Sequence, residues 1–322
     1  MIKLYACTAD TLASCEVSPG AIRAAAWIDL VQPTAEEAAL VEAALALKVP
    51  TAEQMAEIEV SSRLYRVNDT LYMTATLLSA ADTPNPVGAP VTFVLAPSRL
   101  ITVRHVDPRP FQSFVSIAGR PGSGQTGAET AFTGLLDAII NRLADVLEIV
   151  GAELDTLSGS IFEHSHIRAQ DRRDFEVILR QMGRKGDLTS KIRESLVSLG
   201  RLITFASAAT GPEVTKTMRA QLKTMARDVA SLADHAAFTS HKINFLLDAT
   251  LGLLNIEQNA TIKIFSVVAV IFLPPTLIAS IYGMNFDYMP ELHWLVGYPL
   301  AVVMMILSSV LPYWYFKRRG WL

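Results

Sequence analysis

Residues 264–282 have the sequence IFSVVAVIFLPPTLIASIY, which contains no charged side chain. A second uncharged stretch of 23 residues extends from Trp294 to Phe316. Each stretch is close to the ~20 residues that a helix needs to cross the hydrocarbon core of a bilayer. The alternative, two buried helices of a soluble core, fits less well because such long soluble helices almost always carry a polar face. The sequence therefore predicts two transmembrane helices.

The composition of the 322-residue chain agrees with this prediction. Only 18% of the residues are charged, against about 25% in a typical soluble domain, and residues 264–322 hold just five charged side chains. A formal net charge of -3 provides no general attraction for nucleic acid, so we expect no nucleic-acid partner. Two cysteines, Cys7 and Cys15, are too few for a disulfide framework.

The distribution of charge around the two stretches predicts their orientation. The short connection between them carries Asp287 and Glu291 but no lysine or arginine. Basic residues lie at the opposite ends, with Lys263 before the first stretch and the run 317–319 after the second. The positive-inside rule places such residues in the cytoplasm. We therefore expect a hairpin embedded in membrane lipid with both chain termini in the cytoplasm.

The first 107 residues predict a cytoplasmic α/β domain. A helix is expected from Thr34 to about Leu47, because Thr34 and Glu37 have the spacing of a capping box, and a shorter helix is expected over 51–59. Strand-like runs separated by turn residues predict two hairpins, formed by 63–67 with 71–78 and by 91–95 with 100–104.

Residues 108–130 are rich in glycine and proline and are predicted to be a linker. They include Gly122, Gly124 and Gly127 in the spacing GxGxxG. This spacing indicates a dinucleotide site only between a strand and a helix, and no strand pattern leads into it here. We therefore expect no nucleotide cofactor.

Helical apolar spacing then continues almost to the end of the chain, and we expect an α+β protein with a long helical stalk. The predicted parts after the linker are an antiparallel helical pair over 131–211, one stalk helix over 212–282 that becomes the first span at 264–282, an external loop at 283–293, the second span at 294–316 and a basic cytoplasmic tail at 317–322.

One line of residues along the stalk helix follows alternating steps of four and three. This repeat of 3.5 residues is typical of a helix that packs around an axis with copies of itself. Serine and threonine in the first span all fall on the line, either because their hydroxyls bond back to the helix or because the line faces an axial water-filled path. The members of this line, hereafter the stripe, are Asp248, Gly252, Asn255, Asn259, Ile262, Ser266, Ala269, Leu273, Thr276 and Ser280.

The loop after the first span begins with Gly283-Met284-Asn285 and continues with Met289-Pro290-Glu291-Leu292. This pattern, at the outer end of the first of two C-terminal spans, resembles the CorA family of magnesium and cobalt channels. The resemblance implies a homopentameric funnel in a bacterial-type inner membrane, with the first span of each subunit lining the pore. It implies that Gly283, Met284 and Asn285 form an external selectivity filter that contacts the cation through its bound water.

The resemblance also implies roles along the pore. Thr276 would form a hydroxyl ring, Leu273 and Ile262 an apolar constriction, and Asp248 an acidic ring at the cytoplasmic entrance. Asp287 and Glu291 would attract cations to the outer mouth. Regulatory Mg²⁺ would bind between cytoplasmic domains, but its ligands are not placed by the sequence. The acidic side chains available for it are Asp10, Glu53, Glu57, Glu59, Asp82, Asp171 and Asp174.

The predicted function is membrane-potential-driven passage of hydrated Mg²⁺, and also of Co²⁺ and Ni²⁺, with no cofactor. A zinc transporter of the same superfamily is one alternative. A cytoplasmic regulatory or enzymatic domain anchored by the hairpin is another, although no nucleophile or metal motif of an enzyme occurs in the sequence. His164, His166 and His293 are weak metal candidates, since the first two are two residues apart and would face different ways on a helix.

Overall fold

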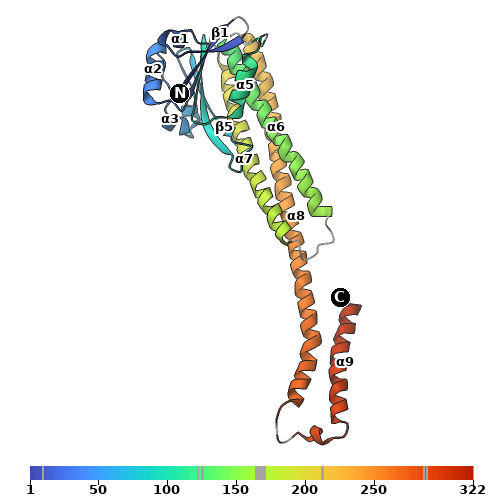
Figure 1. Ribbon diagram of the computed structural model, residues 1–322. Coiled ribbons are helices and arrows are strands. Elements are labelled where there is room, and N and C mark those ends of the chain that lie inside the picture. Colours follow the sequence, from blue (N-terminus) through green and yellow to red (C-terminus); the bar gives the residue numbers. More distant parts are fainter. Residues whose placement is uncertain are drawn as a thin grey trace. The chain divides into compact units, whose positions relative to one another are not determined.

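The computed structural model describes residues 1–8, 11–121, 123–124, 127–163, 172–211, 214–285, 287 and 289–321. The chain forms two compact units, Met1–Leu247 and Asp248–Leu322. The first unit contains a sheet and most of the helices, and the second contains the end of one long helix and a C-terminal helix (Figure 1).

The first unit is built on a seven-stranded sheet with the order β2-β1-β3-β7-β6-β5-β4. All neighbouring strands are antiparallel except β3 and β7, which are parallel and pair Asp29 with Thr102. The strands are β1 (Ile2–Thr8), β2 (Thr11–Cys15), β3 (Trp27–Val31), β4 (Leu64–Val67), β5 (Thr70–Ser79), β6 (Val87–Ala96) and β7 (Arg99–Arg104).

Helices cover both faces of this sheet (Figure 1). On one face, the short helices bury Ile22, Val41 and Met55 against Ile28 and Leu30 of β3. The other face is covered by longer helices. This two-sided burial explains why β5 is buried along its whole length. The helices of this unit are α1 (Pro19–Ala24), α2 (Ala35–Leu45), α3 (Ala52–Ala56), α4 (Val60–Arg63), α5 (Arg109–Ala118), α6 (Ala128–Glu163), α7 (Arg172–Ala208) and the first part of α8 (Lys216–Tyr282).

The predicted elements of the α/β domain are present. Thr34 caps α2, and its capping box with Glu37 is formed in both directions. The two hairpins are formed by β4 with β5 and by β6 with β7. The elements before residue 32, which are β1, β2, α1 and β3, were not predicted from the sequence. Ser18 and Pro19 at the start of α1 are a capping signal that could have indicated this helix.

The prediction that 108–130 is a linker is wrong for Arg109–Ala118, which form α5. Proline in the first turn suits a helix start, and Phe111, Phe114 and Ala118 recur at helical spacing and are buried. Phe114 packs edge-on against Trp27 of β3 at 5.4 Å between ring centroids. The segment was predicted to be a linker because its glycines and prolines are typical of linkers. The helical spacing of its apolar residues covers only about two turns and is a weaker signal. Gly122 lies outside the described residues.

A buried polar network joins β3 to β7 beneath α5. Arg104, 1% exposed, donates from Nε and Nη2 to the carboxylate of Asp29, at 3.0 and 2.9 Å, and Asp29 is also 1% exposed. Thr102 donates to Asp29 at 2.8 Å and accepts from Trp27 Nε1 at 3.0 Å. Burial and the Asp29 charge raise the pKa of the neighbouring Tyr5 phenol to about 12. Both buried charges are therefore paired and hydrogen-bonded, as low-dielectric surroundings require.

Helix α8 is 67 residues long and continues through Pro274 and Pro275 without a break. These prolines deprive the carbonyls of Val270 and Ile271 of their donors, a loss that membrane helices tolerate. The helix was expected to begin at Pro212, which lies outside the described residues. It begins instead after Thr215, whose hydroxyl accepts from the amide of Met218 at 3.1 Å.

The second unit also contains a 3₁₀ turn, η1 (Pro290–His293), and α9 (Gly297–Arg318). Helix α9 begins three residues after the predicted start of the second span at Trp294, because the chain turns there and the Gly297 amide bonds the Trp294 carbonyl at 3.0 Å. The assignment of parts of the chain to cytoplasm, membrane and exterior stays a prediction.

The buried pair yields a stability prediction. Asp29→Asn should lower the free energy of unfolding by about 3 kcal/mol, because it removes the buried carboxylate that Arg104 bonds through Nε and Nη2 and leaves the guanidinium only the half-exposed Asp107 as a counterion. Thermal or denaturant unfolding of the full chain in detergent measures this. The matched control is Asp69→Asn, whose carboxylate pairs with Arg66 while 65% exposed and should cost under about 1 kcal/mol. Equal losses in the two variants would contradict the prediction.

Candidate ion path and outer loop

The second unit contains two helices long and apolar enough to cross a membrane, α9 and the end of α8. They lie antiparallel in Figure 1, and Lys263 on α8 reaches the ring of Trp321 beyond the end of α9, 5.9 Å from its centroid. Val267 and Ala301 are the buried hydrophobic residues of these two segments within the described chain. The two spans therefore form the hairpin that the charge pattern predicts.

Each helix has one line of covered residues. On α8 the line contains Val267, which is buried, and Ile271 and Ile278, which are partly buried. On α9 it contains Ala301 and continues at spacings of three and four residues through Met305, Ser308, Pro312 and Phe316. Such paired lines are expected of two helices that pack along one face each. These lines have no distinct pattern in the sequence, because almost every residue of both spans is apolar.

The stripe lies on the other side of α8. All ten of its members are exposed in the chain. At about 100° per residue, Leu273 is some 140° around the helix from Ile278 and about 160° from Ile271. The stripe therefore faces away from α9. Its hydroxyls are not covered by their own chain and must meet lipid, water or another molecule.

The hydroxyl of Thr276 forms the back-bonding that the sequence analysis gave as one alternative for the stripe, while the water-filled path stays a prediction. Thr276 Oγ1 donates to the carbonyls of Phe272 and Leu273 at 2.9 and 2.8 Å, so it does bond back to the helix. A hydroxyl has one proton and two acceptor lone pairs. Because its proton is used within the helix, the exposed side of Thr276 can only accept hydrogen bonds.

The outer loop begins with a tight turn at the end of α8. The Gly283 amide bonds the Ala279 carbonyl at 2.9 Å, and the Met284 amide bonds the Ile281 carbonyl at 3.3 Å. A Cβ at Gly283 would lie 3.0 Å from the Ala279 carbonyl oxygen, which is too close for an undisturbed backbone. Met284 and Asn285 are exposed. The turn thus presents the amide side chain of Asn285 directly beyond the span.

The two loop carboxylates are less completely described. Asp287 is exposed, and Glu291 lies in η1, although its side chain is outside the described set. His293 is exposed at the end of the same turn. Within the residues that the structure describes, no three His, Cys, Asp or Glu side chains are grouped to hold a metal.

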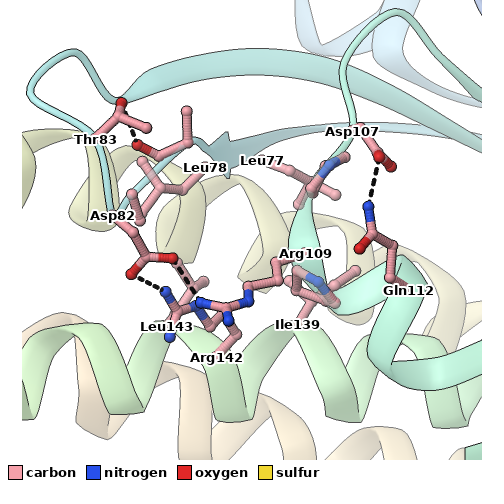
Figure 2. A pocket seen from close by; sticks show the side chains of 14 residues that line it. Leu77, Leu78, Asp82, Thr83, Asp107, Arg109, Gln112, Ile139, Arg142 and Leu143 are labelled. Atoms are coloured by element: carbon pink, nitrogen blue, oxygen red, sulfur yellow. Dashed lines mark hydrogen bonds and ion pairs between the residues drawn. The ribbon is translucent and has the colours of Figure 1, made fainter. Parts of the chain in front are cut away.

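The first unit contains a hollow of about 280 Å³ beside Asp82, one of the acidic candidates for regulatory Mg²⁺. Figure 2 shows Asp82 between two arginines, with Arg142 of α6 at 2.5 Å and Arg109 of α5 at 2.8 Å. The hydrogen bond and charge of Arg142, followed by those of Arg109, lower the pKa of Asp82. Both carboxylate oxygens already have cationic partners, so this residue is a poor metal ligand in this conformation.

The other acidic candidates form no metal-binding group of three or more among the described residues. Glu53, Glu57 and Glu59 are exposed near α3. Asp10, His164, His166, Asp171 and the side chain of Asp174 lie outside the described residues.

The fold and the hairpin define a two-span membrane protein with a large N-terminal α/β unit. The family model described as "CorA-like Mg2+ transporter protein" matches residues 23–318. The magnesium transport protein CorA of Haemophilus ducreyi is 35% identical over the whole of both chains, and that of Escherichia coli K12 is 34% identical over 92% of each.

The solved structures agree in fold. The complete CorA magnesium transporter of Methanocaldococcus jannaschii matches with a TM-score of 0.78 at 18% identity, covering 100% of this chain and 99% of that one. The chain belongs to the family of CorA-like Mg²⁺ transporter proteins, as its sequence pattern indicated.

The tight turn at Gly283 yields a second prediction. Gly283→Ala should move the start of the outer loop, because its Cβ meets the Ala279 carbonyl. We expect at least a tenfold loss of Mg²⁺ flux into liposomes containing the purified protein. In the control Gly151→Ala, nothing lies within 4 Å of the new Cβ, and flux should be unchanged. Normal flux through Gly283→Ala would contradict the importance of this turn.

Proposed function

We propose that the chain forms a homopentameric channel that passes hydrated Mg²⁺ across the inner membrane, and that Co²⁺ and Ni²⁺ can replace Mg²⁺. Both termini lie in the cytoplasm in this proposal. The stripe of α8 lines the pore, α9 forms an outer ring, and the loop that begins with Gly283-Met284-Asn285 forms the external mouth.

The observation that carries the proposal is the two-sided character of α8. Its covered line, which includes Ile271 and Ile278, lies about opposite the exposed stripe. If lipid covered the stripe, the hydroxyl oxygens of Ser266, Thr276 and Ser280 would face hydrocarbon, where no water can donate to their lone pairs. Copies of α8 around a water-filled axis remove that cost. The full-length sequence relatives named above support Mg²⁺ as the transported ion.

The chemistry of the stripe suits an ion that keeps its water. Mg²⁺ dehydrates reluctantly and is usually bound with several waters retained. Those waters direct their protons away from the cation, so the wall that they meet must accept hydrogen bonds. Thr276 presents only acceptor lone pairs, and no stripe residue between Ile262 and Ser280 carries a charge. A wall of this kind can hold a hydrated ion without removing its waters.

The outer mouth, like the stripe, offers hydrogen-bond acceptors to the waters of a hydrated cation. The amide oxygen of Asn285 and the backbone carbonyl of Gly283 would accept hydrogen bonds from cation-bound waters, with Met284 between them. Asp287 and Glu291, repeated in five subunits, would raise the local concentration of divalent cations. Their attraction is modest because exposed charges are screened by salt.

The inner part of the path combines apolar and acidic positions. Leu273 and Ile262 are 64% and 53% exposed, as expected for side chains that meet their copies in a constriction that closes the pore by excluding water. Asp248 would form an acidic ring at the cytoplasmic entrance. The membrane potential supplies the driving force, about 4.6 kcal/mol for a divalent ion crossing 100 mV, so no ATP site is needed.

The two alternatives are less well supported. Zinc transport has no support from the full-length sequence relatives named above, which are magnesium transport proteins. An anchored enzyme would need a catalytic group in the first unit. Comparing the uptake of Mg²⁺ and Zn²⁺ by the same liposomes distinguishes a magnesium channel from a zinc transporter. The absence of any uptake would favour the anchored enzyme.

Asn285→Ala tests the external filter. The change removes the amide oxygen that accepts from the hydrated cation, and we expect Mg²⁺ flux into indicator-loaded liposomes to fall at least a hundredfold. The matched control is Asn85→Ala, which makes the same change at an exposed position in the first unit and should conduct normally. Undiminished flux in Asn285→Ala would exclude this role for Asn285.

Cysteine substitution tests the stripe. In a background with Cys7 and Cys15 replaced by serine, Ser266→Cys and Leu273→Cys should react with a small charged thiol reagent and lose flux. Val268→Cys is the control, since Val268 is also exposed but lies about 160° and 140° around the helix from these two positions. Equal reaction rates at all three positions would contradict a water-filled path along the stripe.

A further inference from the structure

Four cations gather at the end of the hairpin opposite Gly283, and each lies over an aromatic ring. Lys317 lies over Tyr313 at 5.9 Å, Arg318 over Trp314 at 3.8 Å and Arg319 over Tyr315 at 5.4 Å from the ring centroids. Lys263 of α8 lies 5.9 Å from the centroid of Trp321. We refer to these eight residues as the basic-aromatic cluster.

The three pairs on α9 share one geometry. In each, the cation is four residues after the aromatic residue, and long helical side chains point back toward the helix N-terminus. The charges are therefore held about one turn closer to the uncharged part of α9 than their own Cα atoms. This places them beside the aromatic rings, at the border of the span.

The fourth pair depends on how α9 ends. Gly320 has a φ of +68°, its amide bonds the Lys317 carbonyl at 3.2 Å, and the Trp321 amide bonds the Phe316 carbonyl at 3.1 Å. This is a Schellman motif, and the stacking of Trp321 on Phe316 at 5.3 Å is its usual apolar contact. The motif turns the chain back, so that the Trp321 ring reaches Lys263.

Within the described part of the second unit, the cations of the cluster have no acidic side chain as a partner. The sequence has no Asp or Glu between Glu257 and Asp287 or after Glu291. Among the described residues, the side chains of the four cations form no ion pair. Four clustered positive charges repel one another, and an external anion would relieve this repulsion.

We propose that the basic-aromatic cluster binds the phosphate headgroups of anionic phospholipids in the leaflet at this end of the hairpin. The cations supply the charge complementary to the headgroup, and Arg318 and Arg319 can bond phosphate through two N–H groups each. Tyrosine and tryptophan are enriched at the level of the lipid headgroups. A soluble anion would not require the charges to lie at the border of an apolar span, which favours lipid.

This inference is independent of the transported ion, and a direct lipid assay tests it. The full-length protein is reconstituted in phosphatidylcholine vesicles with a trace of spin-labelled phosphatidylglycerol or spin-labelled phosphatidylcholine. The fraction of motionally restricted label gives the relative association constant of the two lipids. We expect the wild type to prefer phosphatidylglycerol roughly three- to tenfold. No preference in the wild type would overturn the proposal.

Variants then locate the site. Lys317→Gln/Arg318→Gln/Arg319→Gln should bring the preference close to one. Lys216→Gln/Lys223→Gln/Arg227→Gln removes three exposed cations from α8 in the first unit and should retain the preference. Trp314→Leu/Tyr315→Leu keeps every charge of the cluster, and this variant should lose part of the preference for phosphatidylglycerol. A full preference in the first variant would overturn the proposed site, and a full preference in the last would overturn the role of the rings.

Discussion

A helix inside a bilayer has no water with which to satisfy a polar side chain, and this constraint governs the second unit. In the span of α8 the three hydroxyls, of Ser266, Thr276 and Ser280, lie on one exposed line, and the covered side chains lie about opposite. The chain by itself therefore leaves its polar line uncovered. In the proposed assembly around an axis, the polar line faces water instead of lipid. The same arrangement creates a path for an ion.

The same constraint explains why recognition in the proposed channel acts through water. The stripe within the span offers hydroxyls, small residues and apolar side chains but no carboxylate to replace a hydration shell. Thr276 gives its proton to the helix and keeps its lone pairs free. Asn285 and the Gly283 carbonyl are acceptors of the same kind. An ion with a tightly held shell fits such walls better than one that exchanges its waters for protein ligands.

The membrane part of the chain could be predicted more fully than the α/β domain. Uncharged stretches, the charge difference across the hairpin and the 3.5-residue repeat are long-range patterns, and each was visible in the sequence. The first strands were not, because strands such as Trp27–Val31 are short and carry a buried charge at Asp29. Helix α5 was hidden among glycines and prolines that usually mark a linker.

Contacts between side chains were also beyond the sequence. The pairing of Asp82 with Arg109 and Arg142 joins residues up to 60 positions apart, and no local pattern indicates it. The line of α8 that packs against α9 is equally hidden, since Ile271 and Ile278 have apolar neighbours on every side. The roles of the stripe and of the outer loop rest on the proposal of assembly, which the single chain does not contain.

The mass of the purified complex tests that assembly most directly. Native mass spectrometry of the detergent-solubilised wild type should give five copies of the 35.1 kDa chain, because the proposed assembly is a homopentamer with one α8 from each subunit around the path. A monomer or a dimer as the sole species would contradict the account, since the stripe would then have no axis to face.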